Sequence, residues 1–173
     1  MGFLRDRGRE ATTGSRYRMR QRLLSIGDDY WIEAEDGRRA FRVDGKALRI
    51  RKTFVLEDAA GNEVAKLQER KLSVRDKMEI ERGGRPVATV KKALIGIRDR
   101  FSIALEDGPD LDAKGNLVDH EYEITRDGDT IANVSKRWFR VRDTYGVEIA
   151  EGEDEALVLA ITVCIDAMSH PRE

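Results

Sequence analysis

Apolar and polar residues alternate in short runs along most of this chain. Met78 and Ile80 flank a glutamate, and Tyr122 and Ile124 flank another. A period of two places one face of a strand inward and the other toward water. Turns such as Asp127-Gly128 separate the runs and supply the positive φ that tight hairpins need. About a dozen short strands follow this pattern, which is typical of an antiparallel sandwich or barrel.

The chain also repeats itself. The stretch that begins at Met78 aligns without a gap to the stretch that begins at Tyr122, and about a third of the paired residues are identical. A shorter copy lies upstream, where Val64 corresponds to Val87. Each copy contains two strands, a glycine turn and an Arg-Asp corner such as Arg98-Asp99. No copy is long enough to bury its own apolar face, so neighbouring copies must cover one another.

One segment near the C-terminus departs from the period of two. The run EALVLAITVCIDAM, residues 155–168, is apolar on nearly every side, and Pro171 follows it as a stop signal. A helix of this kind is buried all round, and its expected length of roughly 20 Å matches the height of a small barrel. We predict a core helix with these packing residues: Leu157, Leu159, Ala160, Ile161, Val163, Cys164 and Ile165.

The helix decides between a sandwich and a barrel. A barrel of about a dozen strands is too wide for wall side chains alone to fill, and a central helix would fill it. We therefore predict an all-β fold with one helix, in which about twelve antiparallel strands form a closed barrel around an apolar C-terminal helix. We assign residues 16–170 to this single domain and residues 1–15, which are highly charged, to a disordered basic tail.

Composition narrows the class of protein. The 173 residues are 40% hydrophobic and 38% charged, which favours a modest core beneath a heavily charged surface. The net charge is −1, although basic residues predominate before Thr53 and acidic residues after Phe101. Cys164 stands alone, the N-terminus lacks a signal peptide's apolar core, and the one apolar run falls short of the roughly 20 residues that span a bilayer. We expect a cytoplasmic protein without a transmembrane segment, and membrane association stays open.

Catalytic and metal-binding patterns are weak. Cys164 lies in the apolar run, where a thiol serves as packing, and no nucleophile elbow is present. His120 and His170 lack the spacing of a triad or a metal site, so we expect them to be solvated or to satisfy turns. We predict that the protein is not an enzyme and uses no cofactor.

The spacing of acidic residues in segment 110–121 partly matches a calcium-binding loop. Asp110, Asp112, Gly115 and Glu121 match four positions of an EF-hand loop. However, Lys114 stands where that loop needs an oxygen ligand, and the flanking segments are strand-like rather than helical. A plain hairpin explains the segment, and we expect no calcium there.

The basic stretch RYRMRQRLL is the best candidate for binding. On a strand, Tyr17 and Met19 would face one side, and the other side would carry a row of arginines: Arg16, Arg18, Arg20 and Arg22. Three interpretations stay open, namely an edge strand kept soluble by charge, contact with anionic lipid, or contact with nucleic acid. A pI near 6.2 and few aromatic residues disfavour nucleic acid.

Several segments resemble the LURP-one-related family, part of the tubby-C-terminal-like superfamily that also includes the phospholipid scramblases. The resemblance to its small bacterial members runs from about Ser15 to about Met168. It is most specific at Val134–Phe139, at Asp143–Tyr145 and in the apolar helix ending at Asp166. It implies a twelve-stranded antiparallel barrel around a central helix and supplies no enzyme activity.

Two functions follow from the residues and the resemblance. The first is a non-enzymatic binding or scaffold module whose partner is an unidentified protein. The second is a peripheral membrane protein that binds anionic phospholipid head groups through the arginine row. Tubby relatives bind phosphoinositides and scramblases act at membranes, but their lipid-contacting residues match no motif here. The lipid function is therefore an analogy at the level of fold.

Overall fold

The computed structural model describes residues 14–20, 29–45, 53–70, 77–93, 100–139 and 144–169. Within these ranges, twelve strands follow one another along the chain and precede one α-helix. The strands are β1 (Ser15–Arg20), β2 (Tyr30–Ala34), β3 (Arg39–Gly45), β4 (Thr53–Asp58), β5 (Glu63–Glu69), β6 (Lys77–Arg82), β7 (Arg85–Ala93), β8 (Arg100–Leu105), β9 (Leu111–Asn116), β10 (Glu121–Arg126), β11 (Asp129–Ser135) and β12 (Thr144–Ile149). The helix α1 spans Glu155–Ser169, and a turn of 3-10 helix, η1, spans Lys136–Trp138.

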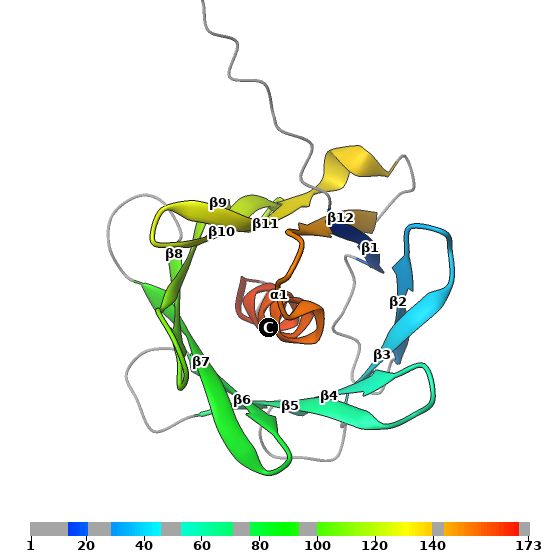
Figure 1. Cartoon of the computed structure of the whole chain (residues 1–173), viewed down its shortest axis with the longest axis horizontal. Coiled ribbons are helices and arrows are strands. Elements are labelled where there is room, and N and C mark those ends of the chain that lie inside the picture. The colour runs from blue at the N-terminus through cyan, green and yellow to red at the C-terminus, as the bar shows by residue number, and fades with distance from the viewer. Residues whose placement is uncertain are drawn as a thin grey trace, which may run out of the picture.

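The strands form one closed wall (Figure 1). Each strand pairs antiparallel with its neighbours in sequence, and β1 pairs with β12 from Ser15 opposite Ile149 to Arg20 opposite Thr144. The predicted twelve-stranded antiparallel barrel is therefore confirmed. The interpretation of the arginine-bearing segment as an edge strand is wrong, because closure pairs β1 on both sides and removes the edge.

The period of two in the sequence corresponds to the two faces of the wall. Met78 and Ile80 on β6 point inward and are buried, as are Tyr122 and Ile124 on β10, whereas Glu123 between the latter two is exposed. Inward side chains from all twelve strands join one hydrophobic core. In strands such as β6 and β10 the alternation therefore reports burial, whereas β4 and β12 each have four consecutive buried residues.

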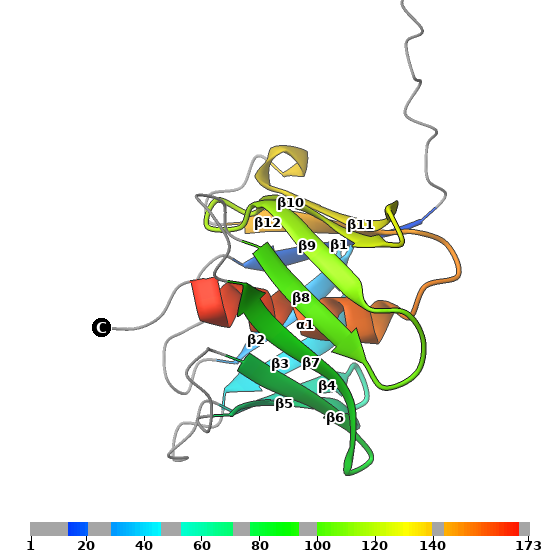
Figure 2. The same cartoon turned by 90° about the vertical axis from the view of Figure 1, so that its left-hand side faces the viewer.

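Helix α1 runs through the middle of the barrel, enclosed by the wall (Figures 1 and 2). The predicted enclosure of an apolar C-terminal helix is confirmed, and it follows from a sequence that leaves the helix no polar face for water. The helix residues buried to 1% exposure or less include Leu159, Ala160, Ile161, Val163, Cys164 and Ile165, whereas Leu157 in the first turn is only partly buried.

Ion pairs hold the start of α1 at one mouth of the barrel. The Arg82 guanidinium donates to both oxygens of Asp154 at 2.6 and 2.9 Å, and the Arg126 guanidinium donates to both oxygens of Glu153 at 2.7 and 3.0 Å. Arg82 and Arg126 occupy equivalent positions in the two long repeats. The internal repeat has therefore placed two matching arginines at the helix entrance.

Two further contacts fix the first turn. The Asp154 carboxylate accepts from the backbone N–H of Leu157 at 3.1 Å and so caps the helix, and the Tyr17 hydroxyl donates to the carboxylate of Glu155. The hydrogen bonds from Arg82 hold the pKa of Asp154 below its usual value. Negative groups at this end also favour the helix dipole.

Some predictions fall on residues that the structure does not describe. The predicted tail, residues 1–15, lies almost wholly outside the described ranges, and so do Arg22 and His170. The assignment of residues 16–170 to a single domain stays a prediction.

Candidate functional site

The outer face of β1 carries the arginines that the sequence placed there. Tyr17 and Met19 point into the core, whereas Arg16 and Arg18 are about one-third exposed and Arg20 is fully at the surface. The alternation along this strand is thus as expected. The strand lies at the seam of the barrel, where the first strand meets the last.

A short segment crosses the outside of this seam. After β11 the chain forms η1, which lies beside β12 on the outer side of the wall (Figure 1). Trp138 and Phe139 lie directly on Gly146 of β12: a Cβ atom there would be 2.6 Å from Trp138 Cε3 and 2.8 Å from Phe139 Cε2. Only glycine allows both rings to approach the strand so closely.

Hydrogen bonds donated to the Glu121 carboxylate fix η1 in this position. This carboxylate accepts from the Ser135 hydroxyl at 2.9 Å and from the backbone N–H of Lys136 at 3.0 Å. The Ser135 oxygen in turn accepts from the backbone N–H of Arg137 at 3.1 Å and caps the turn. The position of both rings is therefore set by the backbone rather than by loose packing.

The two rings meet the arginines of β1 one by one. The Arg16 guanidinium lies 5.1 Å from the centre of the Trp138 ring, and that of Arg18 lies 4.7 Å from the centre of the Phe139 ring. Both distances fall within the range of cation–π attraction, which contributes about 0.5–1 kcal/mol at exposed sites. Alternate residues on a strand are about 7 Å apart, so consecutive aromatic side chains can match alternate arginines.

Carboxylates neutralise two members of the row. Arg16 donates to Glu148 at 2.7 Å and to Glu35 at 3.5 Å, and Arg18 donates to Glu33 at 3.4 Å. These contacts join β1 to β12 and β2 and so help to close the wall. Arg16 and Arg18 therefore have a structural role at the seam, whatever else they contact.

The more accessible cations lie at the two ends of the cluster. Arg20 is exposed at the end of β1, and Arg137 on η1 has 86% of its side chain exposed and approaches Glu121 only at 3.9 Å. Trp31 projects outward from β2 beneath the Arg39 guanidinium at 5.0 Å. On the β1–β2 side of the seam, Arg18 lies opposite Glu33, and Trp31 follows on β2 two residues from Glu33.

We call this surface the arginine–aromatic patch. It consists of Arg16, Arg18, Arg20, Trp31, Lys136, Arg137, Trp138 and Phe139. Both tryptophans of the chain belong to it. The sequence predicted the arginines by strand parity but missed the aromatic residues. The sequence did contain a signal for Trp31, because its neighbour Ile32 faces inward and alternation along a strand then turns Trp31 outward. The positions of Trp138 and Phe139 depend on closure of the barrel, which no local pattern reports.

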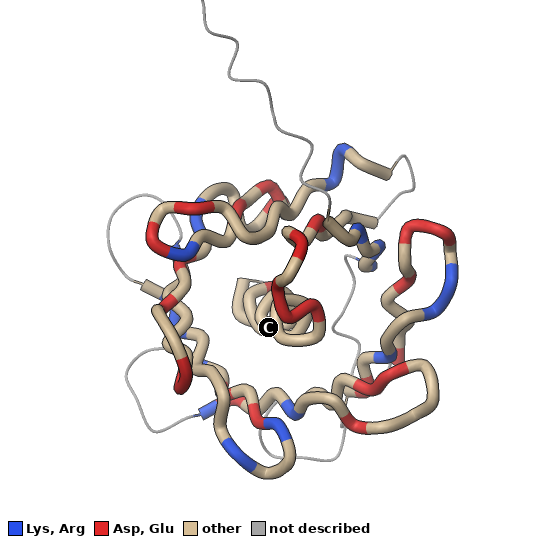
Figure 3. The backbone as a smooth tube through the Cα atoms, in the orientation of Figure 1, with Lys and Arg blue, Asp and Glu red and all other residues tan. Residues whose placement is uncertain are grey.

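Charge is unevenly distributed over the molecule. Lys and Arg mark η1 and the neighbourhood of β1, Asp and Glu mark the start of α1, and both signs occur at the β2–β3 and β6–β7 hairpins (Figure 3). The patch therefore has a locally basic character on a chain whose net charge is −1. A surface of this kind attracts anions within about a Debye length, ~8 Å at physiological ionic strength.

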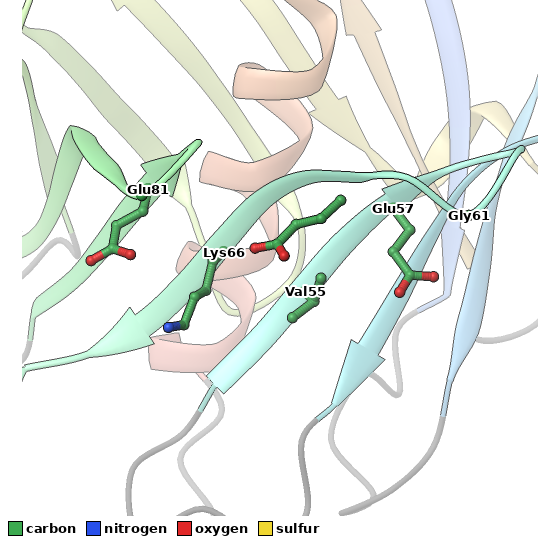
Figure 4. A pocket seen from close by; sticks show the side chains of 7 residues that line it. Val55, Glu57, Gly61, Lys66 and Glu81 are labelled. Carbon is green, nitrogen blue, oxygen red and sulfur yellow. The ribbon is translucent and has the colours of Figure 1, made fainter.

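A shallow recess of about 570 Å³ lies on another part of the outer wall, between the β4–β5 and β6–β7 hairpins (Figure 4). Its floor is Val55, and charged residues surround it. Glu57 accepts from Arg42 at 2.8 Å and Glu81 from Arg70 at 3.4 Å. These two carboxylates therefore already have guanidinium partners. Its lining residues are Val55, Glu57, Gly61, Glu63, Lys66, Glu81 and Gly84.

The histidine and the cysteine singled out in the sequence lie inside the barrel. His120 does occupy a turn, but it is buried at 1% exposure, so the expectation of a solvated side chain is wrong. It contacts Asp166 of α1, which the sequence gave no reason to pair with it. Cys164 is fully buried, and burial raises the pKa of its thiol. A thiol in this state is a poor nucleophile.

The calcium-like residues are engaged elsewhere. Asp112 accepts from Arg100 at 2.9 Å, and Glu121 binds Ser135 and η1 as described above. In the part of the chain that the structure describes, no three His, Cys, Asp or Glu side chains are arranged to hold a metal ion. No helix in the described ranges is long and apolar enough to cross a bilayer.

Known proteins place this architecture in a family. A solved X-ray structure of a protein from Arabidopsis thaliana superimposes with a TM-score of 0.70 over 92% of this chain and 94% of that one. At 18% identity, this likeness concerns the fold alone. An uncharacterized protein of Bacillus subtilis, YxjI, is 27% identical over 104 residues, which are 60% of this chain and 62% of that protein. The LURP-one-related family model matches residues 15–166, and the chain belongs to that family.

Proposed function

We propose that this chain is a non-enzymatic binding module whose contact surface is the arginine–aromatic patch. The proposal is carried by one observation: three aromatic rings lie on the outer wall of a barrel, each beside an arginine. Tryptophan and arginine are the residues most enriched at the energetic centres of protein interfaces. The interior is occupied by α1, so a protein or a membrane must bind from outside.

The charge of the patch indicates the chemistry of the partner. Arg20 and Arg137 are exposed, whereas the cations between them are already balanced by glutamates. A partner surface that places carboxylates or phosphates over the two exposed guanidinium groups would gain attraction without displacing those glutamates. We therefore expect an anionic partner surface.

The test compares two double variants with the same net charge. Arg20→Gln/Arg137→Gln removes the two exposed cations of the patch. Arg85→Gln/Lys91→Gln removes two exposed cations from β7, on the other side of the barrel. On a sulfonated resin at pH 7, the wild-type protein should be retained and the patch variant should elute at lower salt. Equal elution shifts for both variants would contradict the proposal, because retention would then report only net charge.

A second candidate function is that of a peripheral membrane protein that binds anionic phospholipid head groups. The partly buried rings of Trp31 and Trp138 beside arginines favour it. Tryptophan is enriched at membrane–water interfaces, and each basic residue near an anionic leaflet contributes about 1 kcal/mol.

Vesicles of defined composition separate the two candidates. Phosphatidylcholine vesicles with and without phosphatidylserine should be titrated with wild-type protein over a salt series. Lipid binding should require the anionic lipid, should weaken as salt rises, and should be lost in Arg20→Gln/Arg137→Gln but retained in Arg85→Gln/Lys91→Gln. No binding by the wild-type protein at low salt would remove the lipid function and leave an acidic protein surface as the partner.

A further inference from the structure

The inner end of α1 is held by polar groups that are sealed from solvent. The Nε2 atom of His120 lies 2.7 Å from the Oδ1 atom of Asp166, and both side chains are only 2% exposed. His120 has φ of 54°, a left-handed conformation that is uncommon for residues other than glycine. Its ring stacks on that of Tyr145 with 4.1 Å between the centroids. The turn before β10 therefore adopts a costly backbone conformation that buries this imidazole.

Three buried tyrosines feel the negative charge of the same carboxylate. Tyr30, Tyr122 and Tyr145 come from β2, β10 and β12 and are exposed by 8%, 6% and 0%. Burial, followed by the negative charge of Asp166, raises the pKa of Tyr30 and of Tyr145 well above the usual value.

Two of these hydroxyls point to a ligand. The hydroxyls of Tyr30 and Tyr145 have no hydrogen-bond partner among the described residues, and neither has that of Tyr122, although Thr162 lies beside it. Leaving a buried hydroxyl without a partner costs stability, so most buried polar groups in folded proteins have at least one hydrogen-bond partner. A polar site of this kind inside a protein is typically bridged by a small molecule that makes about three hydrogen bonds.

We propose that the inner polar cluster, Tyr30, Tyr145, His120 and Asp166, binds one small neutral molecule of the size of water. It would accept a hydrogen bond from one tyrosine hydroxyl and donate to the other or to the carboxylate. A neutral ligand fits better than an ion, because a second buried charge beside Asp166 would carry its own desolvation cost. The ligand would join β2 and β12 to the last turns of α1.

The competing possibility is that both phenols are simply packing groups, and the two cases predict opposite signs. If the hydroxyls bind nothing, Tyr30→Phe and Tyr145→Phe remove an unsatisfied group and leave the protein equally stable or more stable. If they hold a bound molecule, each variant loses a hydrogen bond. The unfolding equilibrium constant should then rise about fivefold, as expected for a typical net hydrogen bond.

The experiment combines urea denaturation of the variants with a direct probe for water. Tyr17→Phe serves as the positive control, because the Tyr17 hydroxyl donates to Glu155 at the other end of the helix. In the wild-type protein in H₂O, NMR should detect nuclear Overhauser transfer from a long-lived water to ring protons of Tyr145 or His120. Destabilisation of both variants together with this transfer supports the site. Neutral or stabilised variants, or no transfer to either ring, would overturn it.

Discussion

The two ends of α1 are held in different ways. At the start of the helix, Arg82 and Asp154 form an ion pair at the barrel mouth, with side chains 29% and 48% exposed. Near its end, His120 and Asp166 form a pair with both side chains 2% exposed. Exposed ion pairs contribute about 0–1 kcal/mol, whereas leaving a buried hydrogen-bonding group without its partner costs about 1–3 kcal/mol. The mouth should therefore respond to salt and pH, and the inner end should respond mainly to mutation.

The difference follows from how far water reaches each end of the helix. The mouth faces water, so long arginines from the wall can reach over and bind Glu153 and Asp154 in fork-like pairs while staying hydrated. The inner end has no such access. A carboxylate there needs hydrogen-bond donors within the core, and the turn that bears His120 supplies one. The same helix is thus held by hydrated ion pairs at the mouth and by a hydrogen bond sealed from solvent at its other end.

The largest effect should come from charging the middle of the helix, between the two ends. Leu159→Asp or Val163→Asp places a carboxylate without a partner in the core, at a cost of several kcal/mol against a typical total stability of 5–15 kcal/mol. We expect unfolded or insoluble protein, measured by soluble yield and circular dichroism. Leu157→Asp is the matched control, because Leu157 is only partly buried near the mouth and should give folded protein. A folded, soluble Leu159→Asp variant would contradict the enclosed helix.

Next in size is loss of the inner pair. Asp166→Ala leaves a buried His120 nitrogen without its partner and should reduce the free energy of unfolding by about 2–3 kcal/mol. Asp166→Asn keeps an oxygen acceptor and should cost less. Cys164 provides the readout, because its thiol is buried and should react with thiol reagents only when the helix opens. Labelling should be much faster in Asp166→Ala than in the wild-type protein, and nearly independent of salt. Rapid labelling of the wild-type protein would sink the idea of a sealed inner end.

The sequence predicted the arrangement of strands and helix better than it predicted which side chains contact one another. The period of two and the all-apolar run are local signals, so the barrel and the enclosed helix could be predicted. The partners of the arginine row could not, because Arg16 and Glu148 are 132 residues apart and meet only when the barrel closes. The burial of His120 could not be predicted for the same reason. Its partner Asp166 is 46 residues away on the helix, and an isolated histidine in a turn gives no signal of burial.

A smaller effect should follow from loosening the mouth. Arg126→Gln removes the paired hydrogen bonds to Glu153 and should lower the free energy of unfolding by at most about 1 kcal/mol. The difference from the wild-type protein should shrink in about 1 M salt, where the Debye length falls to about 3 Å. Urea denaturation at two salt concentrations measures both quantities. A loss as large as that of Asp166→Ala would show that the two ends are not held differently.

The smallest expected effect is a dependence of stability on pH through Asp154. Hydrogen bonds from Arg82 lower the pKa of this carboxyl in the folded protein relative to about 3.9 in the unfolded chain. A lowered folded-state pKa means that the contribution is fully present above the unfolded pKa and is lost as pH falls through the folded pKa. Urea denaturation of the wild-type protein and of Arg82→Gln from pH 6 to pH 2 isolates this contribution, because the variant lacks the guanidinium that donates to Asp154. The two stability curves should converge on acidification, and parallel curves would show that the mouth does not sense pH through this pair.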